Sequence, residues 1–204
     1  LPSNWLGFVF AQGDLGISGS APITLIKLLS VVFLVAANGF FVAAEFALVA
    51  VRRSRVAQLV AEGRARARAL KRATDNLDAY LAATQLGITI SSLALGWIGE
   101  PALAHLIEPL LAGLGSFAVA GSHAIAVAIA FVIITALHIV LGELAPKSLA
   151  LQRSEATALR VVMPLRLFSF LFRPAIVTLN GLGNLVLRLI GLKPAAAEES
   201  LHSP

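Results

Sequence analysis

Polar side chains recur at helical spacing inside three long apolar stretches of this sequence. In the first stretch Asn38 and Glu45 are seven residues apart, which places them on one face of a helix, two turns from each other. The other two stretches carry similar stripes, with steps of three or four residues: Gln85, Thr89 and Ser92 with Ser91 beside them, then Thr135, His138 and Gly142 with Glu143 next. We expect three helices to turn these stripes toward a common interior.

The stripes offer carboxylate, amide and hydroxyl oxygens, and the chain contains no cysteine. Oxygen ligands of this kind suit hard cations such as Mg²⁺ or Ca²⁺ rather than soft metals. The sequence therefore predicts a metal-cation site with these ligands: Glu143, Gly142, Asn38, Gln85, Thr89 and Ser92. A second group is predicted to support the site or to couple a second ion: Glu45, His138, Ser91 and Thr135.

Pro146 adds a backbone oxygen to this site. A proline has no N–H, so the carbonyl of Gly142, four residues earlier, loses its helical partner. Broken helices whose carbonyls face a cavity bind cations in many transporters. We therefore expect Gly142 and Glu143 to supply two oxygens from one short segment, while glycines such as Gly87 allow close helix approach.

Each of these residues also has a structural interpretation. Hydroxyl groups bond to their own helix or join helices at little cost, which is the favoured role of three residues taken singly: Thr89, Ser91 and Ser92. A lone histidine such as His138 is more often a hydrogen-bonded structural residue than a ligand. Glu45 is near enough to Arg52 and Arg53 to form an interfacial ion pair, and Lys147 is expected to extend into the lipid headgroups.

The composition indicates which elements must position these residues. The chain of 204 residues is 58% hydrophobic and only 13% charged, about half the usual charged fraction, and its mean hydropathy is +0.86. A soluble domain of this length cannot bury so much apolar surface, which excludes a soluble enzyme, a disordered chain and a coiled coil. The sequence contains no HExxH, P-loop or GxSxG motif, so we expect no enzymatic activity.

Uncharged stretches predict three membrane spans, at about residues 23–51, 78–99 and 122–145, because about 20 apolar residues cross a bilayer. Eight Lys and Arg residues lie from 52 to 72, and none lies from 73 to 146. Basic loops stay in the cytoplasm, which predicts an N-terminus outside and a C-terminus in the cytoplasm. The net charge of +5 is then explained by topology and contact with anionic membrane lipids, not by nucleic-acid binding.

The predicted fold is an all-α membrane protein with three transmembrane helices and juxtamembrane interfacial helices. We expect residues 1–22 to be an extracytoplasmic leader, residues 52–72 and 153–192 to form the interfacial helices, and residues 193–204 to be a linker. A tilted fourth span within 161–192 is the less favoured alternative, because arginines and prolines interrupt that stretch.

Three segments carry a resemblance to a known family: NGFFVAAEFALVAVRRSR at 38–55, LDAYLAATQLGITISSLALGWIGEPALA at 77–104 and HIVLGELAPKSLA at 138–150. Together they resemble the transmembrane domain of the CNNM/CorC magnesium transporters, in the bacterial hemolysin-like branch. The resemblance covers about residues 23–192. The order and spacing of the LDxYLxxxQLGIT and GELAPK runs make it specific.

The resemblance implies a homodimer in the bacterial cytoplasmic membrane, with three transmembrane helices and a belt of juxtamembrane helices in each subunit. It implies Mg²⁺ efflux driven by Na⁺ entry, and a cytoplasmic CBS-domain pair that binds nucleotide after the membrane domain. We expect this chain to stop where that pair begins. The alternative is a membrane-anchored regulator or scaffold of another transporter, but a mere anchor does not need a buried polar cluster.

The sequence departs from the best-known branch of that family at two ligand positions. The resemblance places a Ser and an Asn beside the third-helix Glu in the metal site. Here Val42 stands at the position of the Ser, Thr89 stands at that of the Asn, and only Glu143 is retained. We expect Asn38, Gln85 and Thr89 itself to replace the missing ligands.

Overall fold

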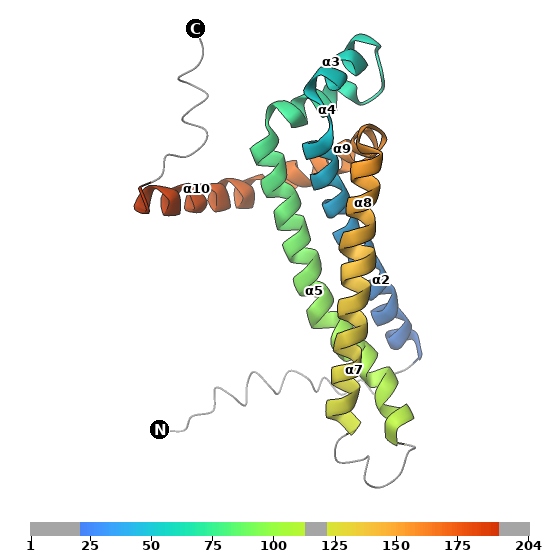
Figure 1. Cartoon of the computed structure of the whole chain (residues 1–204). Coiled ribbons are helices and arrows are strands. Elements are labelled where there is room, and N and C mark those ends of the chain that lie inside the picture. Colours follow the sequence, from blue (N-terminus) through green and yellow to red (C-terminus); the bar gives the residue numbers. More distant parts are fainter. Residues whose placement is uncertain (1–20, 113–121, 192–204) are drawn as a thin grey trace.

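The computed structural model describes residues 21–112 and 122–191, and every regular element within these ranges is a helix. Three rods run side by side as a bundle (Figure 1): α2 (Ala21–Ala50), α5 (Leu77–Ala112), and a third made of α7 (Ser122–Leu137), the π-helix η2 (His138–Leu144) and α8 (Ala145–Gln152). Three described segments are long and apolar enough to cross a membrane: Ile23–Ala50, Leu77–Leu111 and Ser122–Gln152. The predicted all-helical fold with three spans is therefore confirmed.

Helix α5 is longer than the predicted second span. It continues past residue 99 and through two prolines to Ala112, although the sequence predicted a loop from residue 100. A proline inside a helix removes one hydrogen bond and often ends it. Here the extension buries Ala102 and Ala104, and this packing sustains the helix, so the predicted end is wrong. The rest of the predicted loop, 113–121, lies outside the described residues.

The basic segment after α2, predicted to be interfacial over residues 52–72, forms two short helices. They are α3 (Arg53–Ala61) and α4 (Ala67–Asp75). Between them, Gly63 has φ +67° and Arg66 has φ +68°. A residue in the left-handed region cannot continue a right-handed helix, so the chain turns here.

The interfacial segment after the third rod also consists of two helices. They are α9 (Ser154–Leu171) and α10 (Arg173–Leu189), which are bent by 79° relative to each other. The pair is apolar enough to form one broken span, but α10 is directed away from the bundle, across rather than along α5 (Figure 1). The interfacial placement of this segment stays a prediction. The predicted leader and linker, 1–20 and 192–204, lie outside the described residues.

The main hydrophobic core lies where α2 meets the short helices and α9. Its large buried side chains come from four helices: Leu48, Val56, Leu70, Val162 and Leu165. A smaller cluster joins the three rods: Val31, Val35, Leu95 and Ile134. Many other apolar side chains are exposed, among them Trp97 at 82%, as expected for a surface that contacts lipid.

Candidate functional site

The third rod is interrupted by the π-helix η2, which the sequence did not predict. Within it the N–H of Ala145 bonds to the carbonyl of Val140, five residues earlier instead of four. Pro146 follows in the first turn of α8 and has no N–H to donate. Turns of π-helix are rare and frequently lie at functional sites. The local sequence signal for this break in the helix is the run that contains Gly142, Glu143 and Pro146.

Asn38 on α2 binds the π-helix directly. Its Nδ2 donates a hydrogen bond of 2.9 Å to the carbonyl oxygen of Gly142, and the Asn38 side chain is only 1% exposed. The acceptor fixes the orientation of the amide, because a flipped amide would set two oxygens against each other. The prediction of an unpaired Gly142 carbonyl is therefore wrong, since Asn38 supplies the N–H that Pro146 cannot.

The other end of the same amide has no partner. The Oδ1 atom of Asn38 is buried and accepts no hydrogen bond within the part of the chain that the structure describes. Leaving a buried acceptor unsatisfied costs about 1–3 kcal/mol, and nearly all such groups in native proteins are paired. A cation or an ordered water next to Oδ1 would satisfy it.

Helix α2 and the π-helix approach each other at backbone distance. A Cβ added to Gly39 would lie 2.9 Å from Cγ of Pro146 and 3.2 Å from the carbonyl oxygen of Leu141. A Cβ added to Gly142 would lie 3.0 Å from the ring of His138. Neither glycine can be enlarged without displacing a neighbour, so the carbonyls of Leu141 and Gly142 face α2 in a fixed geometry.

Helix α5 does not direct its predicted stripe into the bundle. Gln85 and Thr89 are exposed and Ser92 is half-buried. Thr89 donates a hydrogen bond of 2.8 Å to the carbonyl of Gln85, and Ser92 donates to that of Ile88, so both hydroxyls are satisfied within their own helix. The hydroxyl side chains of α5 that turn inward are those of Thr84 and Ser91, which are 0% and 4% exposed. Within a single chain, the expected convergence of this stripe with α2 is not seen.

Glu45 and Glu143, the two carboxylates predicted for the site, form no ion pair in the described part of the chain. Glu143 follows Gly142 directly, but its side chain is exposed. Glu45 is half-buried and lacks the ion pair with Arg52 or Arg53 that the sequence allowed. Neither carboxylate is therefore paired with a basic side chain within the described residues.

The other predicted residues lie around this contact. Thr135 and His138 are half-buried on the third rod. The ammonium of Lys147 lies 4.7 Å from the centroid of the Phe46 ring, which is a cation–π contact. Val42, at the position of the family Ser, is 4% exposed and has no ligand atom.

The residues in the described ranges 21–112 and 122–191 include no cluster of three His, Cys, Asp or Glu side chains fit for a metal. A cation site here would therefore use the Asn38 amide oxygen, backbone carbonyls, a single carboxylate and water. Mg²⁺ accepts such a set because it dehydrates reluctantly and usually keeps several waters.

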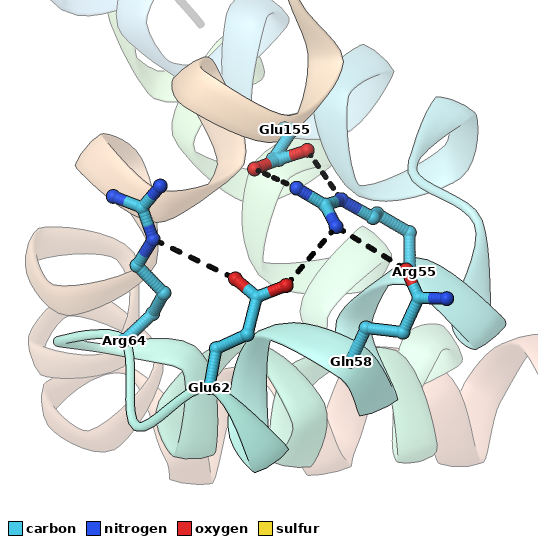
Figure 2. Close-up of polar contacts among 5 residues, drawn as sticks. All are labelled: Arg55, Gln58, Glu62, Arg64 and Glu155. Carbon is cyan, nitrogen blue, oxygen red and sulfur yellow. Dashed lines mark hydrogen bonds and ion pairs between the residues drawn. The ribbon is translucent and has the colours of Figure 1, made fainter.

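Sequence reasoning missed an ionic cluster beyond the spans (Figure 2). Arg55 on α3 binds Glu155 on α9 with two hydrogen bonds, of 2.9 Å from Nε and 3.3 Å from Nη2. The same guanidinium donates to Gln58 at 3.2 Å and to Glu62 at 3.4 Å, and Arg64 lies 3.8 Å from Glu62. The cluster ties the segment after α2 to the start of α9, 100 residues later, and nothing local in the sequence pairs residues so distant.

The bond to Arg55 also sets the protonation of Glu155. Hydrogen bonding and the positive charge of Arg55 hold the pKa of the Glu155 carboxyl below its ordinary value, and the carboxylate raises the pKa of Arg55 in return. The two side chains are 40% and 37% exposed, so water screens their attraction. The pair is therefore a positional tie more than a large source of stability.

Comparison with known proteins agrees with the architecture. The family CNNM, described as the Cyclin M transmembrane N-terminal domain, matches residues 29–204. The UPF0053 protein YhdT of Bacillus subtilis is 48% identical over 170 residues, which are 83% of this chain and 37% of the relative. The uncharacterized protein Rv1841c of Mycobacterium tuberculosis is 42% identical over 170 residues, 83% of this chain and 48% of the relative.

A third relative has a name that describes an activity. The polyamine export protein of Salmonella typhimurium is 38% identical over 170 residues, 83% of this chain and 37% of the relative. The chain spans less than half the length of each of these three relatives. The family match covers most of the chain, and the three apolar rods have the length of membrane spans. The chain therefore belongs to the CNNM family, as a multi-pass membrane domain.

Proposed function

We propose that this domain moves a divalent metal cation, with Mg²⁺ favoured, out of the cytoplasm across the bacterial cytoplasmic membrane, driven by Na⁺ entry. The observation that supports this most is the Asn38 amide oxygen, which is buried without a partner beside a π-helix in the third span. In a helix bundle that served only as an anchor, this unpaired acceptor would cost stability without a compensating function.

In this proposal Asn38 Oδ1 and the backbone carbonyls facing α2 bind the cation from inside the bundle. Glu143 supplies negative charge from the exposed side of the π-helix. Water molecules complete the shell of six oxygens that Mg²⁺ prefers. Because the Glu143 side chain is exposed in the single chain, it contacts the cation through water or from a second subunit. Glu45 and His138 are the residues proposed to couple the entry of Na⁺ to the export of the cation.

A second cargo is favoured by one observation. The name of the Salmonella typhimurium relative describes polyamine export, and a polyamine is a flexible organic cation that also needs carboxylates. Glu45 and Glu143 lie on neighbouring rods and are free of ion pairs in the described residues. A flux assay should therefore offer both cargoes.

The test is flux from proteoliposomes loaded with Mg²⁺ or with spermidine, using the chain and two matched carboxylate variants. Glu143→Gln keeps the shape and removes the charge, so we expect it to abolish flux while the fold is retained. Glu45→Gln should reduce flux less. Flux by Glu143→Gln equal to the parent, with Glu45→Gln inactive, would show that the essential carboxylate is the other one. If neither variant changes flux or metal binding, the cation site lies elsewhere in the chain. If the parent itself gives no flux, the regulator or scaffold function replaces transport.

We also propose that the protein works as a homodimer, with the N-terminus outside and the C-terminus in the cytoplasm. The exposed polar residues of α5 and η2, Gln85, Thr89 and Glu143, are poorly suited to lipid and would be covered by a second subunit. A monomeric mass in lipid nanodiscs would exclude this assembly. In the whole protein, a cytoplasmic CBS-domain pair is the proposed regulatory partner.

A further inference from the structure

The outer face of α9 and α10 is apolar and has no partner within the described chain. On α9 the side chains opposite the core are 43–73% exposed: Met163, Leu167 and Phe170. On α10 only Ile176 is buried, and one face is formed by exposed aliphatic side chains: Leu179, Leu182, Leu185, Val186 and Leu189. So much apolar surface on an element outside the bundle needs a cover.

The α9 part of this face is hollowed around an arginine. Met163, Arg166, Leu167 and Phe170 line a shallow, open hollow of about 270 Å³. These residues are spaced by three, four and seven positions, which places them on one side of the helix. The side chain of Arg166 is exposed, so a cation stands at the edge of an apolar hollow.

The charge of this region has a single sign. From residue 156 to residue 191 the chain carries four arginines and no Asp or Glu: Arg160, Arg166, Arg173 and Arg188. None of the four forms an ion pair within the described residues. On α10, Arg173 and Arg188 share a helix face with Asn180 and Asn184, opposite the exposed aliphatic face. An amphipathic helix with arginines on its polar face is typical of a membrane interface.

We propose that the α9 hollow binds one anionic phospholipid, with Arg166 on the phosphate and an acyl chain over Met163, Leu167 and Phe170. Charge complementarity supports this occupant, because an exposed, unpaired arginine at a membrane interface attracts an anionic headgroup and the apolar hollow beside it suits an acyl chain. Helix α10 lies in the same interface and places its aliphatic face against the lipid. This site does not depend on the transported ion.

The test uses a tryptophan placed in the hollow and lipids whose brominated acyl chains quench it. Phe170→Trp is introduced into a background in which the two native tryptophans, Trp5 and Trp97, are replaced by Phe. The protein is reconstituted in phosphatidylcholine vesicles with increasing fractions of brominated phosphatidylglycerol, and in the reverse mixture. The two quenching curves give the preference of the site for the anionic lipid.

We expect phosphatidylglycerol to be preferred by about fivefold, the effect of one arginine near an anionic surface. Arg166→Gln should bring the preference close to one, whereas Arg166→Lys should retain most of it. Arg68→Gln, which removes the same charge from an exposed position on α4, is the matched control and should change nothing. An equal preference for both lipids in the parent, or an unchanged preference in Arg166→Gln, would overturn the proposal. Absence of quenching by either lipid would also overturn it, because protein such as a second copy would then cover the hollow.

Discussion

The contact between Gly87 and Phe41 is the point where the packing of α5 on α2 is most sensitive to one methyl group. A Cβ added to Gly87 would lie 2.5 Å from two atoms of the Phe41 ring. That ring is 8% exposed and cannot move aside easily. Its centroid lies 5.1 Å from that of Phe40 and 4.7 Å from that of Phe168, and the Phe168 ring stacks on a further phenylalanine at 4.4 Å.

We therefore expect Gly87→Ala to destabilise the bundle. Overpacking of a well-packed core by one methyl group costs about 1–3 kcal/mol. Against this, replacing Gly by Ala in a helix gains about 1 kcal/mol. The matched control is Gly96→Ala on the same helix, because a Cβ added to Gly96 meets no atom within 4 Å. Both variants share the helical gain, so their difference of about 1–3 kcal/mol measures the contact with Phe41.

The assay is the free energy of unfolding, measured by titrating the detergent-solubilised chain with SDS. A double-mutant cycle with Phe41→Leu completes the test. The smaller side chain leaves room for the new methyl group, so Gly87→Ala should cost at least 1 kcal/mol less in that background. If Gly87→Ala is as stable as Gly96→Ala, or if Phe41→Leu restores nothing, the close approach of the two helices does not limit stability.

Two further predictions concern the ion pair between Arg55 and Glu155 and the topology. Arg55 lowers the pKa of Glu155 in the folded state, so their pairing stabilises the fold above the ordinary carboxyl pKa and this contribution is lost as the pH falls through the lowered pKa. Glu155→Gln should therefore reduce the loss of unfolding temperature toward acid pH, when that temperature is measured as a function of pH. The same acid dependence in the variant and in the parent would contradict the pairing. The chain has no native cysteine, so single cysteines can be placed at the exposed positions Ala65 and Leu110. A thiol reagent should label them from opposite sides of the membrane. Labelling of both from the same side would exclude the three-span topology.

The three spans were predictable because their signal is local. Each is a stretch of apolar residues long enough to cross a bilayer, whatever the helix packs against. The ends of the helices were less predictable, because tertiary contacts decide whether a helix continues through a proline. Ala102 and Ala104 make such contacts. The basic segment turns at Gly63, and a single glycine among residues that favour a helix is a weak local signal for a turn.

The orientation of the polar stripes was the weaker part of the prediction. Periodicity states which residues share a face, and it placed Gln85 and Thr89 together correctly. It does not state which face turns inward, and on α5 the inward hydroxyls belong to Thr84 and Ser91. Counting by 3.6 residues also assumes an unbroken α-helix, and the π-helix changes the register of the third rod before Glu143 is reached.

The contact between Asn38 and Gly142 shows how far the chemistry of single residues leads. Pro146 correctly indicated that a nearby carbonyl needs a new partner, and Asn38 was correctly selected as a polar residue of the first span. The sequence does not contain the distance that joins them, across 104 positions. Nor does it tell which end of the amide meets the carbonyl.

That orientation matters for the proposed site. Since the Nδ2 end of Asn38 is bonded to Gly142, its oxygen points elsewhere, and a cation can bind there without breaking the bond between the two helices. Asn38 is then both a ligand and the tie between α2 and the π-helix, so any substitution at Asn38 changes ion binding and packing together. Glu143 makes no hydrogen bond or ion pair in the described chain and is exposed, and its replacement by Gln therefore separates the role of charge from that of structure.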